Sequence, residues 1–179
     1  MTTAIVAFGS AFVVGTAVTY AMRHLAPRIG AVDMPDGYRK IHTRAIPYLG
    51  GIGVFAGFLF PVVLLMTAFR HLVPARHLLG VAESFTVILA GASIALLMGA
   101  WDDIRGMRPR VKLLFQVMAA LVAMAGGQVI HRRSLPFVGE VSLGYWGIPL
   151  TMFWYLGCMN AINLLDNMDG LSAGVAAIA

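Results

Sequence analysis

The chain has 179 residues, of which 59% are hydrophobic and only 12% are charged. This composition is too apolar for a soluble domain and predicts a membrane protein. The net charge of +5 does not indicate nucleic-acid binding, because neither aromatic–basic interleaving nor a soluble domain accompanies it. We therefore expect an all-α fold, a polytopic transmembrane helical bundle, with no nucleic acid among its partners.

Five uncharged runs of about 18–22 residues are each long enough, at roughly 1.5 Å per residue, to cross a hydrocarbon core of about 30 Å. A sixth apolar run begins at Leu171 and reaches Ala179, a length that covers only about 13 Å as a helix. We expect residues 1–179 to be a single transmembrane domain that forms the N-terminal part of a larger bundle. The five complete spans are predicted at Thr2–Met22, Tyr48–Phe69, Ser84–Trp101, Leu113–Ile130 and Trp146–Leu165.

Charged residues are divided unevenly between the loops on the two sides of these spans. Nine of the 13 basic residues lie on one side, which the positive-inside rule makes cytoplasmic. Carboxylates beside cations at one membrane face suggest a metal ion and a phosphorylated ligand. Six of the eight acidic residues lie on that same side, namely Asp33, Asp36, Asp102, Asp103, Asp166 and Asp169.

The longest of these connections, Arg23–Pro47, is punctuated by proline and glycine and is predicted to be turn rather than helix. Its cations satisfy the positive-inside rule whatever the function, but they share a face with the acidic motifs. In the second span, Gly53 and Gly57 form a small-xxx-small pair, which is typical of close helix packing. The cations of the connection are Arg39, Lys40, His42 and Arg44.

Asp102 and Asp103 follow the third span directly. Adjacent carboxylates repel each other, so both stay ionised most easily beside a cation such as Mg²⁺ or an arginine. Mg²⁺ commonly uses one or two carboxylates together with substrate phosphates. The alternative is that two aspartates simply end a helix in the headgroup region.

The end of the fifth span reads N-A-I-N-L-L-D-N-M-D-G. Its polar residues recur every three positions, so a continuing helix would place them along one slowly drifting stripe. Polar groups at the end of an apolar span cost free energy unless they face a cavity or a partner. Helix capping is the alternative, although a cap requires one such residue and not four. The four are Asn160, Asn163, Asp166 and Asp169.

Three stretches together carry a family resemblance: D-M-P-D-G-Y-R-K-I-H-T-R-A-I-P-Y-L-G-G, W-D-D-I-R-G-M-R-P-R-V-K-L-L-F-Q and N-A-I-N-L-L-D-N-M-D-G-L. They resemble the bacterial polyprenyl-phosphate N-acetylhexosamine-1-phosphate transferases, of the glycosyltransferase family 4 type. The undecaprenyl-phosphate GlcNAc-1-phosphate branch is the most similar. The related phospho-MurNAc-pentapeptide transferases read G-T-P-T-M-G-G where this chain has A-I-P-Y-L-G-G, which favours the amino-sugar branch.

The resemblance implies transfer of a sugar-1-phosphate, foremost GlcNAc-1-phosphate, from a UDP-sugar to undecaprenyl or another polyprenyl phosphate. The products would be polyprenyl-diphosphate-sugar and UMP, for cell-envelope polysaccharide synthesis at the bacterial inner membrane. The reaction would require Mg²⁺, with Mn²⁺ as a substitute. A homodimer is one option for the oligomeric state, which the sequence leaves open.

The resemblance also assigns roles to matching residues. Asp102 and Asp103 would be the catalytic pair and, with Asn163, would bind the metal. Lys112 would contact a phosphate, Asn163 would also help bind the diphosphate, and Asp166 and Asp169 would line the nucleotide-sugar site. Apart from the resemblance, we expect the basic-loop residues Arg39, Lys40 and His42 to bind substrate as well. The later half of family members supplies another metal-binding aspartate and a histidine-rich loop.

Phosphoryl transfer depends mostly on positioning and on charge neutralisation by metal ions, Lys and Arg. Two alternatives remain open at this stage. A prenyltransferase would be expected to show a longer N-D-x-x-D-x-x-x-D run, and a transporter would be expected to place ionisable groups near mid-membrane.

Overall fold

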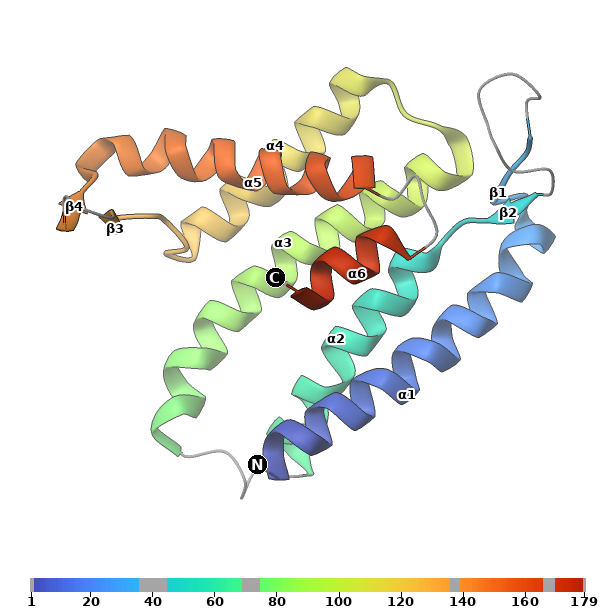
Figure 1. Cartoon of the computed structure of the whole chain (residues 1–179), viewed down its shortest axis with the longest axis horizontal. Coiled ribbons are helices and arrows are strands. Elements are labelled where there is room, and N and C mark those ends of the chain that lie inside the picture. Colours follow the sequence, from blue (N-terminus) through green and yellow to red (C-terminus); the bar gives the residue numbers. More distant parts are fainter. Residues whose placement is uncertain (1, 36–44, 69–74, 136–138, 166–169, 179) are drawn as a thin grey trace.

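The computed structural model describes residues 2–35, 45–68, 75–135, 139–165 and 170–178. Helices dominate this part of the chain (Figure 1), which confirms the predicted helical class. The α-helices are α1 (Thr2–Leu25), α2 (Gly50–Thr67), α3 (Ala75–Arg105), α4 (Pro109–Ala125), α5 (Gly147–Leu165) and α6 (Leu171–Ile178). The shorter elements are the 3₁₀ helices η1 (Ala26–Ile29) and η3 (Gly144–Trp146) and the strands β1 (Val32–Asp33), β2 (Ile46–Pro47), β3 (Arg132–Leu135) and β4 (Gly139–Ser142).

Four helical segments within the described residues are long and apolar enough to cross a membrane: Thr2–Ile29, Gly50–Thr67, Phe85–Arg105 and Gly144–Leu165. Large apolar side chains on them, such as those of Phe8 and Phe153, are exposed, as expected of surfaces that face lipid. The chain is therefore a membrane protein.

The fourth expected span, Leu113–Ile130, is not confirmed. Its helix, α4, begins earlier than expected, at Pro109, and is 17 residues long. It ends at Ala125 because two glycines follow, and Gly127 has a φ of 84°, a left-handed conformation that glycine adopts without steric cost.

Helices α1 and α2 run alongside each other (Figure 1) and pack through glycine. A Cβ placed on Gly57 would lie 3.1 Å from the carbonyl oxygen of Ala11 and 3.2 Å from the Cα of Gly15. A Cβ on Gly53 would collide with the side chain of Thr19. The predicted small-xxx-small contact is thus confirmed, and its partner is the backbone of α1.

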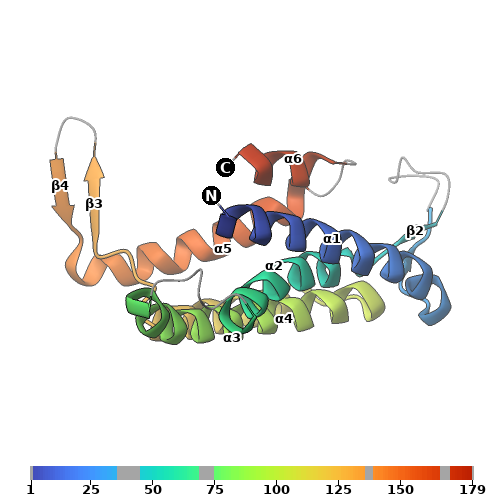
Figure 2. The ribbon, with the colours of Figure 1, turned by 90° about the horizontal axis from the view of Figure 1, so that it is seen from below.

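Two short antiparallel strand pairs lie at opposite ends of the molecule (Figure 2). In the β1–β2 pair, Val32 pairs with Pro47 and Asp33 with Ile46. The other pair, β3–β4, joins Arg132 to Ser142 and Leu135 to Gly139. Neither pair was predicted from the sequence, because strands of two to four residues are too short to give a periodic signal. The β1–β2 pair brings residue 33 close to the start of α2.

Candidate active site

The paired aspartates form part of the last turn of α3. The C-terminus of a helix carries partial negative charge, so carboxylates there are unfavourable unless donors or cations compensate them. Gly106, with a φ of 67°, ends the helix and donates its N–H to the Asp102 carbonyl oxygen at 2.8 Å. The chain then turns back toward the two carboxylates.

Asp102 is held by two donors from the segment that follows it. The main-chain N–H of Met107 donates to Oδ1 at 2.8 Å, and the ammonium of Lys112 donates to Oδ2 at 2.7 Å. Pro109 at the first position of α4 starts that helix at once, and this places Lys112 within reach of Asp102. The Asp102 and Lys112 side chains are 24% and 23% exposed, respectively, so the ion pair is only partly screened by solvent.

The same lysine also reaches α5. Its Nζ lies 3.4 Å from Oδ1 of Asn163, a long hydrogen bond that joins the third motif to the second. Lys112 therefore connects two polar groups that lie 61 positions apart in the sequence, at Asp102 and Asn163.

A second polar contact between α4 and α5 involves Gln116 and Asn160. Each amide donates to the oxygen of the other, at 3.3 and 3.0 Å, and Asn160 also donates to the Leu156 carbonyl oxygen at 2.8 Å. Gln116 is only 3% exposed, so this reciprocal pair satisfies polar groups inside the packed helices. Two residues of the predicted polar stripe therefore have different partners. Asn160 pairs with Gln116 where α4 and α5 pack, and Asn163 contacts Lys112.

Asp103 is bound by the first motif. The main-chain N–H of Leu49 donates to its Oδ2 at 3.0 Å. Leu49 has a φ of 70° and is the one non-glycine residue with positive φ in the described ranges. This left-handed conformation costs an L-residue roughly 1–2 kcal/mol. Such strain persists only where the surrounding structure enforces it.

Tyr48 brings a third carboxylate into the cluster. Burial, a hydrogen bond to Asp33 and the charges of Asp33, Asp103 and Asp102 together raise the pKa of Tyr48 to about 12, with burial the largest cause. The tyrosine hydroxyl is therefore a neutral donor to the Asp33 carboxylate at physiological pH. Asp33, Asp102 and Asp103 are close enough to act on the same phenol.

The donor set fits a hard cation. Asp102, Asp103 and Asn163 offer carboxylate and amide oxygens, the ligands that Mg²⁺ prefers. Among the described residues, no group of three or more His, Cys, Asp or Glu side chains is arranged to hold a metal alone. An Mg²⁺ ion here would need further oxygens from substrate phosphates, which is its usual mode of binding.

The structure brings together some of the predicted site residues, and others lie outside the described ranges. Lys112, Asn163 and the Asp102–Asp103 pair are brought together as described, whereas Tyr48 and Leu49 were not singled out. Both stand in the run P-Y-L-G-G, so the resemblance in that run was the available signal. Five candidates lie outside the described residues: Arg39, Lys40, His42, Asp166 and Asp169.

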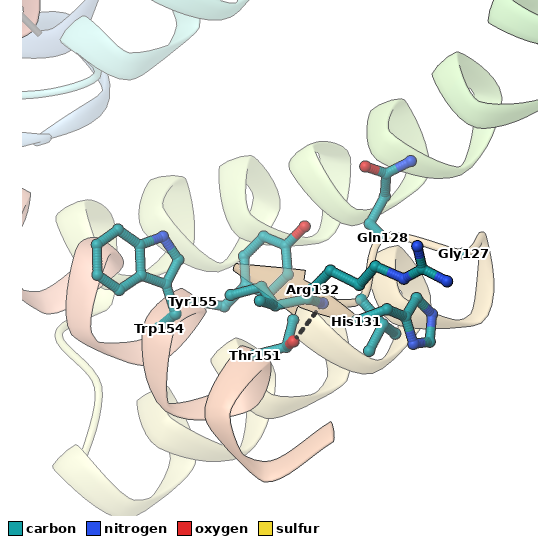
Figure 3. A pocket seen from close by; sticks show the side chains of 9 residues that line it. Gly127, Gln128, His131, Arg132, Thr151, Trp154 and Tyr155 are labelled. Carbon is teal, nitrogen blue, oxygen red and sulfur yellow. Dashed lines mark hydrogen bonds between the residues drawn. The ribbon is translucent and has the colours of Figure 1, made fainter. Parts of the chain in front are cut away.

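A cavity of about 600 Å³ lies where α4 ends and α5 begins (Figure 3). These are the helix ends away from Lys112 and Asn163. Segment 127–132 lines it together with three side chains of α5, those of Thr151, Trp154 and Tyr155. Thr151 accepts a hydrogen bond from the N–H of Ile130 at 2.9 Å, and this bond fixes the segment to the helix. None of the lining residues is a carboxylate, so the cavity is separate from the acidic cluster.

The fold and the cluster define a polytopic helical membrane protein whose carboxylates and lysine meet at the ends of its helices. Residues 85–179, more than half of the chain, match the sequence model of glycosyl transferase family 4. The chain belongs to this family, as the resemblance in its three motifs predicted.

Curated relatives agree with this assignment. The chain is 34% identical over 175 residues to a probable undecaprenyl-phosphate N-acetylglucosaminyl 1-phosphate transferase of Bacillus subtilis, covering 97% of this chain and 45% of the relative. It is 31% identical to the undecaprenyl-phosphate alpha-N-acetylglucosaminyl 1-phosphate transferase of Yersinia pestis, covering 93% of this chain and 42% of that relative. It is 29% identical to the enzyme of the same name of Escherichia coli K12, covering 94% of this chain and 43% of that relative. The chain thus spans less than half the length of these relatives. No solved structure matches it significantly.

Proposed function

We propose that this protein transfers GlcNAc-1-phosphate from UDP-GlcNAc to undecaprenyl phosphate and releases UMP. The observation that carries the proposal is the contact of Lys112 with Asp102 on one side and Asn163 on the other. It joins two of the three motifs in one charged cluster. The names of the relatives, which specify the lipid phosphate and the sugar 1-phosphate, support the choice of substrates.

In this reaction an oxygen of the lipid phosphate attacks the phosphorus that carries the sugar. The bond from that phosphorus to the bridging oxygen breaks, and UMP leaves with the bond electrons. A phosphate monoester has a second pKa near 6, so the attacking oxygen is already largely ionised at neutral pH. A general base is therefore scarcely needed, and a single in-line displacement is the simplest course.

The residues of the cluster would then bind and orient phosphates. Lys112 supplies positive charge beside the transferred phosphoryl group, where charge neutralisation accelerates the reaction. Asp102, Asp103 and Asn163 would hold Mg²⁺, which when bound supplies further neutralisation of phosphate charge. Substrate binding by Arg39, Lys40, His42, Asp166 and Asp169 remains a prediction.

The topology gives the proposed orientation. Nine of the 13 basic residues lie in the loops on the side of the acidic motifs, so we place the site at the cytoplasmic face of a bacterial plasma membrane. UDP-sugars are made in the cytoplasm, which fits this orientation. Assembly into a homodimer and use of the product for envelope polysaccharide remain predictions.

The decisive experiment incubates purified full-length protein with labelled UDP-GlcNAc, undecaprenyl phosphate and Mg²⁺. We expect release of UMP with label appearing in the lipid. The variant Asp102→Asn should lower the rate by about 100-fold or more, because it removes a charge that would hold Mg²⁺ and that also orients Lys112. The control Glu140→Gln removes an exposed carboxylate from β4 and should leave the rate unchanged.

The alternatives give different products. A prenyltransferase would release diphosphate from a polyprenyl diphosphate donor, and a transporter would leave UDP-GlcNAc intact. Intact UDP-GlcNAc after incubation with the wild-type protein would refute the proposed function.

A further inference from the structure

We propose that the main-chain N–H of Leu49 is a positioning group that fixes the Asp103 carboxylate, and that the left-handed backbone of Leu49 exists to aim it. The effect of this hydrogen bond on the reaction rate rests on the proposed function. Its effect on the position of Asp103 does not, so the positioning and the activity can be tested separately.

The hydrogen bond links residues that are far apart in the sequence. Leu49 immediately precedes α2, and Asp103 lies 54 residues later at the end of α3. The donor comes from the N-terminal end of α2, which carries partial positive charge, and the acceptor lies at the C-terminal end of α3, where a carboxylate needs compensation. The N–H of Leu49 thus compensates negative charge at the C-terminal end of α3.

The conformation of Leu49 is unusual and is enforced from several directions. With φ 70° and ψ 16°, its backbone is left-handed, a region where glycine would normally be found. Leu49 is 4% exposed and packs in a cluster with Ala26 and Ala31. A buried leucine in a conformation suited to glycine indicates that both the side-chain packing and the direction of the N–H matter.

The residues around Leu49 hold the turn in place. The N–H of Tyr48 donates to the Ala31 carbonyl oxygen at 3.0 Å, and the N–H of Ile52 donates to the Leu49 carbonyl oxygen at 3.2 Å. Tyr48 also contacts the Asp33 carboxylate through its hydroxyl. The P-Y-L-G-G run therefore acts on two carboxylates of the cluster, one through a side chain and the other through the main chain.

A matched pair of substitutions separates packing from positioning. Leu49→Ala and Leu49→Gly both remove the buried side chain, but only alanine retains the penalty for a positive φ. In Leu49→Ala the backbone relaxes away from positive φ, and the N–H turns away from Asp103. In Leu49→Gly the left-handed conformation is retained, so this variant keeps the higher kcat if the direction of the N–H matters. We expect about a tenfold difference in kcat in favour of glycine. The KM for UDP-GlcNAc should agree within about twofold.

A role in packing alone predicts the same kcat for the two folded variants, since both lose the same buried side chain, and any difference between them would then appear only in thermal stability. Ile52→Ala serves as a control, because Ile52 packs against the same cluster. It should lower thermal stability without lowering kcat.

Amide hydrogen exchange on the full-length protein, resolved at Leu49, gives a readout independent of activity. The Leu49 amide should be protected in the wild type and in Leu49→Gly. It should exchange at least tenfold faster in Asp103→Ala, which removes its acceptor, and should stay protected in Asp102→Ala. This measurement decides the question even if Leu49→Ala fails to fold.

The inference is overturned if Asp103→Ala leaves exchange at Leu49 unchanged, or if folded Leu49→Ala turns over as fast as Leu49→Gly. Failure of the proposed function would look different. The wild-type protein would then release no UMP, while the exchange pattern at Leu49 would persist.

Discussion

Replacement of Lys112 by methionine tests the centre of the site. The side chain keeps much of its length and apolar stem but loses its charge, so Asp102 loses the donor at 2.7 Å and Asn163 loses the donor at 3.4 Å. The main-chain donor to Asp102, the N–H of Met107, remains. The substitution therefore removes the cation without dismantling the turn between α3 and α4.

The size of the effect follows from the geometry. At 2.7 Å, the Coulomb attraction is about 6 kcal/mol for an effective dielectric constant of about 20, which is an upper bound before desolvation is subtracted. Hydrogen bonds to charged groups contribute about 1.5–3 kcal/mol net. With roughly a quarter of each side chain exposed, we expect about 1–2 kcal/mol of lost stability. If the lysine also contacts phosphate, kcat/KM should fall by about 10- to 100-fold.

The assay is UMP release by the full-length protein, with thermal stability measured in the same preparation. Arg110→Met removes an exposed cation from the same helix and should change neither quantity appreciably. Lys112→Arg keeps the charge and should restore part of the rate. A Lys112→Met protein that turns over within twofold of the wild type would refute the reasoning.

Three further predictions concern packing and protonation. Gly57→Val should separate α1 from α2 and lower the melting temperature by several degrees, whereas Gly9→Ala, with no atom within 4 Å of its new Cβ, should be tolerated; equal melting temperatures would contradict the packing. Gln116→Leu should cost about 1 kcal/mol by removing the side-chain partner of Asn160 on α4, with the rate of UMP release per folded molecule unchanged; a loss of rate would give the pair a functional role. Because the pKa of Tyr48 is raised to about 12, from about 10 in an unfolded chain, it contributes stability below pH 10 that is lost as the pH rises from 10 to 12. Tyr48→Phe should remove that alkaline dependence and leave the pH–rate profile from 7 to 9 with its original shape; a changed shape would show that the phenol titrates in that range.

The sequence predicted the membrane class and most helix positions because long apolar runs have few other stable states. A backbone in lipid must satisfy its hydrogen bonds within itself, so each run becomes a helix. The exact ends of the helices were less predictable. The α4 helix stops at Ala125, where Gly126 and Gly127 interrupt a run that remains uncharged as far as Ile130.

The family and the candidate charged residues could be predicted from the order of residue types, because a motif consists of residue types at fixed spacings. Which of these residues meet depends on how the helices pack. Asn160 and Asn163 are equivalent in the pattern, yet α4 presents Gln116 to one and Lys112 to the other. The proposed role of Leu49 could not be predicted from the sequence either, because every residue except proline has a main-chain N–H. Its direction depends on a backbone angle that packing imposes.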